Sequence, residues 1–242
     1  MAQVECRLWW YRALHHLVAD ALARNHLGHN ARVLDAGCGT GGLMIFLRDL
    51  GYCKLSGFDV SPEAVAVCQQ RNLSVQAGDL RHMDHFCPPA SAEVIVSNDT
   101  LYFFSAEERA RILTSFLRTL VPEGWLILNV PALQAFRGIH DLSVGVSHRF
   151  SRSEMESLLA SIGLRVQSIR YWPFLLSPLI YLKRFSQRVR LKGARAVEVR
   201  SDIDLPPRLL NHGLELITRL ENALLPWKPF GSSLFIIAQK SA

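Results

Sequence analysis

The feature that most constrains the fold is a glycine-rich turn that follows a short apolar segment. Residues 31–36 read ARVLDA, a length and composition typical of a buried strand. Gly37, Gly39 and Gly41 follow at alternate positions, before an apolar stretch of helical length. Glycine lets the backbone turn sharply and lets a ligand approach the main chain, and the first turn of the next helix offers unpaired N–H groups. The segment therefore predicts a strand–turn–helix unit that binds a nucleotide.

Carboxylates around this turn narrow the choice of nucleotide. The glycines alone also fit the GxGxxG dinucleotide fingerprint, because Gly42 follows Gly41. Asp35, however, stands two residues before the first glycine, where it would repel a pyrophosphate and attract a cation. Asp59 lies about 20 residues further on, where a carboxylate can accept hydrogen bonds from ribose hydroxyls, and Asp79 could accept one from an adenine amino group. S-adenosylmethionine, with its ammonium and sulfonium groups, suits these acids better than NAD does.

Predicted strands and helices alternate along the chain. The sequence predicts strands over residues 31–36, 54–59, 73–77, 92–97, 125–130, 164–171 and 233–239, and helices over residues 7–27, 42–49, 61–71, 105–122 and 154–162. Two more helices, over residues 174–192 and 207–225, are expected between the last two strands. This alternation indicates an α/β fold with a largely parallel sheet. We expect one domain over residues 1–242, with an N-terminal helical cap (1–30) and a helical insertion or lid (172–229).

The motifs resemble those of the class I S-adenosylmethionine-dependent methyltransferases, over roughly residues 9–164 and the final strand. Residues 33–41 (VLDAGCGTG), Phe58-Asp59-Val60-Ser61, Gly78-Asp79-Leu80 and the segment from Ser97 to Tyr102 stand where that family has its four motifs. The resemblance implies a Rossmann-like seven-stranded sheet of order 3-2-1-4-5-7-6, with the last strand antiparallel and helices on both faces. It implies S-adenosylmethionine as cofactor and S-adenosylhomocysteine as product. The residues it assigns to the cofactor are Asp35, Ala36, Gly37, Cys38, Gly39, Gly41, Asp59, Val60, Ser61, Gly78, Asp79, Leu80, Asn98, Asp99 and Tyr102.

The methyl acceptor is expected beside the loops after the fourth and fifth strands, because ligands bind at the carboxyl ends of parallel strands. The first loop begins Asn98-Asp99-Thr100 and lacks the Asp/Asn-Pro-Pro-Tyr/Phe motif of related enzymes that methylate planar amino nitrogens. The second loop contains His140, Asp141, His148 and Arg149.

A neutral histidine is the usual proton acceptor near pH 7, so His140 and His148 are candidate general bases, with Asp141 to orient one of them. Packing within the loop is the alternative for both histidines. Arg149 is a candidate substrate ligand, in a loop that resembles a His-Asp…His-Arg-Arg-Tyr/Phe pattern of a little-characterised bacterial branch of the family. No metal site is expected, because most such methyl transfers need no Lewis acid.

Aromatic residues at two places could serve the substrate. Trp9, Trp10 and Tyr11 could close over the bound molecules, or they could pack in the core. Residues 171–182 are apolar and aromatic, and the basic residues Lys183, Arg184, Arg188, Arg190, Lys192 and Arg195 follow them. Such a segment fits peripheral contact with an anionic membrane surface through residues 171–195, or a pocket cover followed by a solvated basic helix. Leucines at helical spacing in residues 207–225 predict a helix that packs its apolar side against the protein body.

Composition narrows the expected partners and cellular location. The formal net charge of +6 favours anionic partners, although no nucleic-acid-binding module is recognisable. Five cysteines without a CxxC pair argue against a disulfide framework or a zinc site and favour the cytoplasm, and no leader or spanning segment is evident.

We therefore expect methyl transfer to an oxygen or nitrogen of a small molecule such as a natural-product intermediate, a sugar or a lipid-linked glycan. An NAD-dependent oxidoreductase is an alternative, weakened by Asp35 and by the lack of a Tyr-x-x-x-Lys pair. An RNA methyltransferase, supported only by the positive charge, and a non-catalytic partner protein are further alternatives. The sequence leaves the oligomeric state open.

Overall fold

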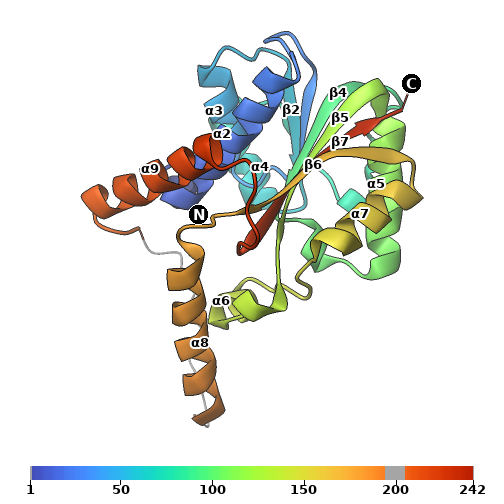
Figure 1. Ribbon diagram of the computed structural model, residues 1–242. Helices are drawn as coiled ribbons and strands as arrows, with labels where there is room; N and C mark the ends of the chain where they lie inside the picture. The colour runs from blue at the N-terminus through green and yellow to red at the C-terminus, as the bar shows by residue number, and fades with distance from the viewer. Residues whose placement is uncertain (1, 194–204, 242) are drawn as a thin grey trace.

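A seven-stranded sheet forms the centre of the protein, which a computed structural model describes over residues 2–193 and 205–241 (Figure 1). The strands are β1 (Val33–Ala36), β2 (Leu55–Asp59), β3 (Val75–Ala77), β4 (Ala92–Asn98), β5 (Leu120–Pro131), β6 (Leu164–Trp172) and β7 (Ser233–Lys240). They lie in the order β3-β2-β1-β4-β5-β7-β6. Neighbours from β3 to β5 are parallel, whereas β7 is antiparallel to both β5 and β6. The predicted fold class, strand order and antiparallel final strand are confirmed.

Helices cover both faces of this sheet (Figure 1). One face carries α2 (Trp9–Arg24), α3 (Gly42–Asp49) and α4 (Pro62–Gln70), and the other carries α5 (Ala106–Thr119) and α7 (Arg152–Ser161). Successive side chains of a strand point to opposite faces. In β1, Val33 packs with α2 and α3, and Leu34 packs with α5. Burial on both faces explains why the central strands are apolar at nearly every position.

Capping residues fix where several helices begin. The Ser61 hydroxyl accepts a hydrogen bond from the Ala64 N–H at the start of α4, and Ser105 and Ser151 form capping boxes at α5 and α7. The helix predicted to run to residue 122 ends at Thr119. The chain becomes extended there because Leu120 already pairs with Ala92 of β4, so β5 begins five residues before its predicted start.

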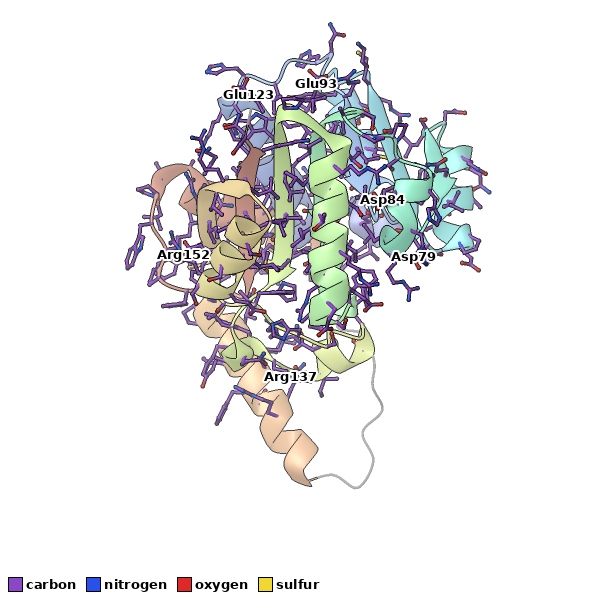
Figure 2. The ribbon with its side chains drawn as sticks, turned by 90° about the vertical axis from the view of Figure 1, so that its right-hand side faces the viewer. Asp79, Asp84, Glu93, Glu123, Arg137 and Arg152 are labelled. Atoms are coloured by element: carbon purple, nitrogen blue, oxygen red, sulfur yellow. The ribbon has the colours of Figure 1, made fainter. Side chains whose placement is uncertain are left out.

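Short elements occur where the sequence predicted none. They are α1 (Ala2–Glu5), α6 (Ile139–Ser143) and the 3-10 turns η1 (Leu80–His85), η2 (Leu101–Phe103) and η3 (Gln134–Phe136). None is long enough to show a hydrophobic period. Most of them lie at the carboxyl edge of the sheet. Figure 2 shows the two edges of the sheet: Glu93 and Glu123 lie at the edge where β4 and β5 begin, and Asp79 and Arg137 lie toward the opposite, carboxyl edge.

The insertion before β7 forms two helices, α8 (Ser177–Gly193) and α9 (Arg208–Leu224), close to their predicted bounds. Helix α8 projects away from the sheet, and α9 lies against α2 (Figure 1). The prediction that α9 buries its leucines is wrong. Leu209, Leu216, Leu220 and Leu224 are exposed. Helix α9 instead meets α2 through polar side chains, because Arg12 and Asn211 form the bonds between them described below.

The described part of the chain contains no helix long and apolar enough to cross a bilayer. Arg195, the last residue of the predicted membrane-contact segment, lies outside the described residues.

Candidate functional site

The glycine turn lies between β1 and α3, and its backbone requires glycine. Gly37, Gly39 and Gly41 all have positive φ angles, between 54° and 82°, a region that L side chains rarely adopt. Space is also lacking, since a Cβ on Gly37 would stand 2.5 Å from Thr100 Cγ2, and one on Gly41 would stand 2.3 Å from Leu73 Cδ1. Both conditions confirm the predicted strand–turn–helix geometry.

Asp59, at the end of β2, holds the turn in place. Its Oδ2 accepts a hydrogen bond from the Gly39 N–H (2.8 Å), and its Oδ1 accepts one from the Ser61 N–H (2.9 Å). The carboxylate keeps lone pairs for further donors, because each oxygen can accept two hydrogen bonds. Asp59 therefore joins the glycine turn to the start of α4, in the place where the sequence predicted a ribose ligand. Val60 beside it is exposed, with 69% of its surface accessible.

Asp35 is buried at the end of β1, next to two other carboxyl groups. Burial raises the pKa of Asp35 to about 8, and the negative charges of Glu5 and Asp59 contribute to this rise. The neighbouring Cys38 is buried, and burial also raises the pKa of its thiol. Burial and the nearby negative charges disfavour the ionised form of Asp35, so this end of the sheet attracts a positive charge.

Glu5 is a site residue that the sequence analysis missed. It accepts a hydrogen bond from the Thr40 hydroxyl, and its side chain lies so close to the turn that a Cβ on Gly42 would stand 2.8 Å from Glu5 Cγ. Burial raises its pKa. No motif marks this residue, because only the folding of α1 back over the glycine turn brings it there.

The residues after β3 are more exposed, at the edge of the site. Asp79 is paired with Arg81, whose Nε stands 3.1 Å and 3.0 Å from the two carboxylate oxygens, and this hydrogen bonding lowers the pKa of Asp79. It also caps η1 through the Arg81 N–H. Any contact of Asp79 with an adenine amino group would compete with Arg81. A Cβ on Gly78 would stand 2.5 Å from the Phe86 ring, so glycine is required there, and Leu80 is buried.

Polar residues at the end of β4 face the same edge. The Oδ1 atom of Asn98 is buried and has no hydrogen-bond partner among the described residues. Asp99 accepts two hydrogen bonds from Asn129 Nδ2 (3.0 and 3.1 Å), and the amide oxygen of Asn129 accepts one from Trp172 Nε1 (2.8 Å). Burial raises the pKa of Asp99 to about 7. Tyr102 is buried nearby, and burial together with the charge of Asp99 raises the pKa of its hydroxyl.

The N-terminal aromatic residues reach this part of the sheet from α2. Trp10 stacks on Trp172, with ring centroids 5.2 Å apart, and Tyr11 packs edge-on against Trp10 at the same separation. Burial and the charges of Asp99 and Glu5 raise the pKa of Tyr11. Tyr11 therefore lies between the glycine turn and the end of β4. Trp9, at the start of α2, donates its backbone N–H to Asn211 of α9 (2.9 Å).

The loop after β5 is held by a buried ion pair. Arg149 Nη2 donates to Asp141 Oδ1 (2.8 Å), and Arg149 Nη1 donates to the carbonyls of Ala132 (2.8 Å) and Ser232 (3.2 Å). The other Asp141 oxygen accepts from the Gly138 N–H (2.6 Å). Asp141 was predicted to orient a histidine, but among the described side chains it bonds no histidine. Arg149, predicted as a substrate ligand, donates its hydrogen bonds to groups within the protein.

The two histidines of this loop are placed differently. His148 Nε2 bonds Glu154 Oε1 (2.8 Å) at the start of α7, and its ring packs edge-on against Phe150. His140 lies in α6, and its side chain is outside the described set. The structure thus groups Asp35, Ala36, Gly37, Cys38, Gly39, Gly41, Asp59, Ser61, Asn98, Asp99, Tyr102 and Tyr11 at the carboxyl edge of β1, β2 and β4, and gives His148 a partner on α7.

Comparison with known proteins adds a family relationship. A family profile described as "Methyltransferase domain" matches residues 33–124. The chain is 34% identical over 113 residues to a trans-aconitate 2-methyltransferase of Mycobacterium sp. (strain KMS), and 31% identical over 113 residues to that of Mycobacterium tuberculosis (strain H37Ra). These matches cover 46% of this chain and 42% and 41% of the relatives, so the chain spans less than half the length of the curated relatives it matches.

Solved structures extend the likeness to nearly the whole fold. A geranyl diphosphate methyltransferase in complex with S-adenosylmethionine superposes with a TM-score of 0.63 at 16% identity, over 95% of this chain and 85% of that one. A methyltransferase of Archaeoglobus fulgidus gives 0.58 at 16% identity, over 93% and 94%. The [4+2]-cyclase SpnF gives 0.61 at 16% identity, over 96% and 84%, so the fold alone does not fix the reaction.

The profile match extends from β1 to the start of β5, a segment that carries Asp35, Asp59 and Asp99, and it does not include Glu5. The strand order and the antiparallel β7 are those expected of the same family. Together these findings show a match to a methyltransferase domain over residues 33–124 and, around it, the sheet order expected of the class I S-adenosylmethionine-dependent methyltransferases.

Proposed function

We propose that the chain binds S-adenosylmethionine at the glycine turn and transfers its methyl group to an oxygen or nitrogen of a small molecule. The observation that carries this proposal is the convergence of Asp35, Asp59 and Glu5 on the turn. Carboxylates that repel one another attract a ligand that brings positive charge. When bound, S-adenosylmethionine supplies an electrophilic methyl group on a positively charged sulfur.

The residues present fit this cofactor. Asp59 would accept hydrogen bonds from the ribose hydroxyls, and Asp35 would balance the charged methionine end. The buried Asn98 Oδ1, which has no partner among the described groups, is an acceptor suited to an ammonium donor. Tyr102 and Tyr11 would exclude water from the methyl group. Fixed positions of this kind favour an in-line displacement through proximity and orientation.

The NAD alternative conflicts with the hydrogen bonding of the turn. A dinucleotide site needs backbone N–H groups directed at a pyrophosphate. Here the Gly39 N–H already donates to the Asp59 carboxylate, so it is not directed at a phosphate. A trans-aconitate acceptor, suggested by the names of the relatives, has no direct support in this chain, because the match covers less than half of it.

Asp99 is the best-placed general base. It lies at the end of β4 within the electrostatic reach of Tyr11 and Tyr102, and its pKa of about 7 is matched to proton transfer near neutrality. Asn129 fixes its orientation. An acceptor hydroxyl or neutral amine attacks the methyl group with a lone pair and loses a proton, and Asp99 would take that proton. His140 remains a candidate from the sequence.

Calorimetric titration tests the cofactor assignment directly. S-adenosylmethionine is expected to bind with micromolar affinity and NAD to give no heat of binding. The reverse result would overturn the proposal. Incubation with methyl-labelled cofactor and a panel of hydroxylated, amino and carboxylated small molecules then tests the acceptor class. RNA serves as the competing acceptor, and label appearing only in RNA would refute the small-molecule assignment.

A further inference from the structure

Helix α9 packs against the protein through its polar side. Its buried residues are Glu215, Thr218 and Glu221. Glu215 Oε2 lies 2.7 Å from Arg12 Nε of α2, and Glu221 accepts the backbone N–H groups of Phe174 and Leu175, each at 2.7 Å. These bonds fix which side of the helix faces inward.

The opposite side of α9 is apolar and exposed. We call it the α9 outer face, and it consists of Leu209, Leu210, Leu216, Ile217, Leu220, Leu224 and the following Trp227. Leu209 is 90% exposed, Leu224 72% and Trp227 71%. At 100° per residue the helical members span an arc of about 120°, the width of the stripe that an amphipathic helix normally buries. No contact within the described residues buries this stripe.

The charged side chains that α9 itself exposes are positive. Arg208 and Arg219 are exposed on α9, whereas both of its glutamates are buried against the body. Residues 171–193 contain no aspartate or glutamate and carry Lys183, Arg184 and Arg188 in α8, whereas the sequence of residues 194–207 has Glu198, Asp202 and Asp204 beside Arg195 and Arg200. Helix α8 also exposes large apolar side chains. The insertion therefore presents leucine, tryptophan and cationic side chains together.

We propose that the α9 outer face docks on an anionic lipid bilayer, lying in the plane of its surface. A helix with leucines and a tryptophan on one side and arginines on its flank matches the interfacial mode, in which apolar side chains enter the headgroup region and cations remain at the phosphates. Neither α8 nor α9 is long and apolar enough to span the bilayer. This surface is separate from the cofactor site, and the proposal does not depend on the methyl acceptor.

Charge favours lipid over a second copy of the chain. In a symmetric dimer through this face, the same patch meets itself. Arg208 and Arg219 of each copy would then face cations; Arg219 Nη1 lies 4.0 Å from the buried Glu215 Oε1 of its own helix, and α9 exposes no glutamate to pair with Arg208. An anionic headgroup layer supplies the missing negative charge.

Vesicle sedimentation of the full chain tests the proposal. Vesicles of phosphatidylcholine and phosphatidylglycerol in equal parts are compared with vesicles of phosphatidylcholine alone. The double variant Leu216→Glu, Leu220→Glu is expected to lower the partition coefficient by at least about tenfold, because two apolar anchors become anionic. Leu50→Glu, at the end of α3, is the matched control, since Leu50 is also exposed but lies on another element. All three substituted leucines are exposed, and equal thermal unfolding midpoints verify that the variants fold.

The proposal predicts binding to the anionic vesicles that weakens with salt and is lost only in the α9 variant. Failure of the unaltered chain to bind anionic vesicles would overturn it. Equal binding by the α9 variant and the control would do the same. Light scattering that shows a dimer dissociated by the double substitution, without vesicle binding, would assign the face to a second copy instead. None of these readouts requires methyl transfer. Failure of membrane docking can therefore be distinguished from failure of the proposed methyltransferase function.

Discussion

Replacing Asp35 by asparagine should make the cofactor-free protein more stable while it abolishes cofactor binding. The folded protein holds the Asp35 proton up to a pKa of about 8, whereas the reference carboxyl loses it near 3.8. Between these values the folded state binds more protons than the unfolded state, so stability falls as the pH rises. At neutral pH ionisation of Asp35 therefore stabilises the unfolded state and not the folded one, and the asparagine side chain of the variant removes this difference because it cannot ionise.

The size of the effect follows from the two pKa values. Each pH unit above 3.8 is worth about 1.4 kcal/mol up to the folded pKa. The cost at pH 7 is therefore about 4 kcal/mol, and at pH 5 it is less than about 2 kcal/mol. For a chain of this size 1 kcal/mol corresponds to about 2–4 °C in melting temperature. We expect Asp35→Asn to melt roughly 10 °C higher at pH 7, with a smaller gain at pH 5.

Differential scanning calorimetry without ligand, at several values between about pH 5 and 8, measures this gain. Asp49→Asn, an exposed carboxyl at the end of α3, is the control and should change stability by less than about 0.5 kcal/mol. Added S-adenosylmethionine should raise the melting temperature of the unaltered chain but not of Asp35→Asn. A destabilised Asp35→Asn variant, or a gain that does not shrink toward pH 5, would refute the reasoning.

Four further predictions concern other contacts. Asp59→Ala removes the acceptor of the Gly39 and Ser61 N–H groups and should weaken S-adenosylmethionine binding at least about tenfold by calorimetry; unchanged affinity would contradict its assignment. Asn129→Leu leaves Asp99 and Trp172 Nε1 unpartnered and should cost about 2–4 kcal/mol in urea unfolding, and a loss below about 1 kcal/mol would contradict the buried network. Arg149→Met should cost about 3–5 kcal/mol by the same measurement, and adding Asp141→Leu should restore most of it. Asp99→Asn should slow methyl transfer by at least about 100-fold while His148→Ala leaves it nearly unchanged, and the opposite ranking would return the base to the histidine.

The sequence predicted those features that depend on local chemistry. The positive φ angles at Gly37 and Gly41 need glycine wherever the turn stands, and three of the four residues of β1 are apolar because both of its faces are buried. The position of Asp59 follows from its distance along the chain to the end of the next parallel strand. Glu5 could not be predicted in this way, because α1 reaches the turn only through tertiary packing.

The loop after β5 shows what residue types alone do not predict. His-Asp and His-Arg pairs at that position indicated an acid–base site, because residue types alone reveal which groups can transfer protons. They do not reveal which groups already have partners. Arg149 and Asp141 satisfy each other and three backbone groups besides. The pair therefore fixes the loop between β5 and β7, a structural role that has the same sequence signature.

In helix α9, too, residue types alone do not reveal which side chains are buried. A 3.6-residue period shows which side chains share a face, and the usual inference is that the apolar face turns inward. In α9 the two buried glutamates reverse this, since Glu215 and Glu221 each meet a cation, Arg12 and Lys228. A buried carboxylate that lost such a partner would destabilise the fold strongly, so α9 cannot rotate its leucines inward without breaking both pairs. The inward face is thus determined by charge, and the leucines remain available to whatever surface the α9 outer face meets.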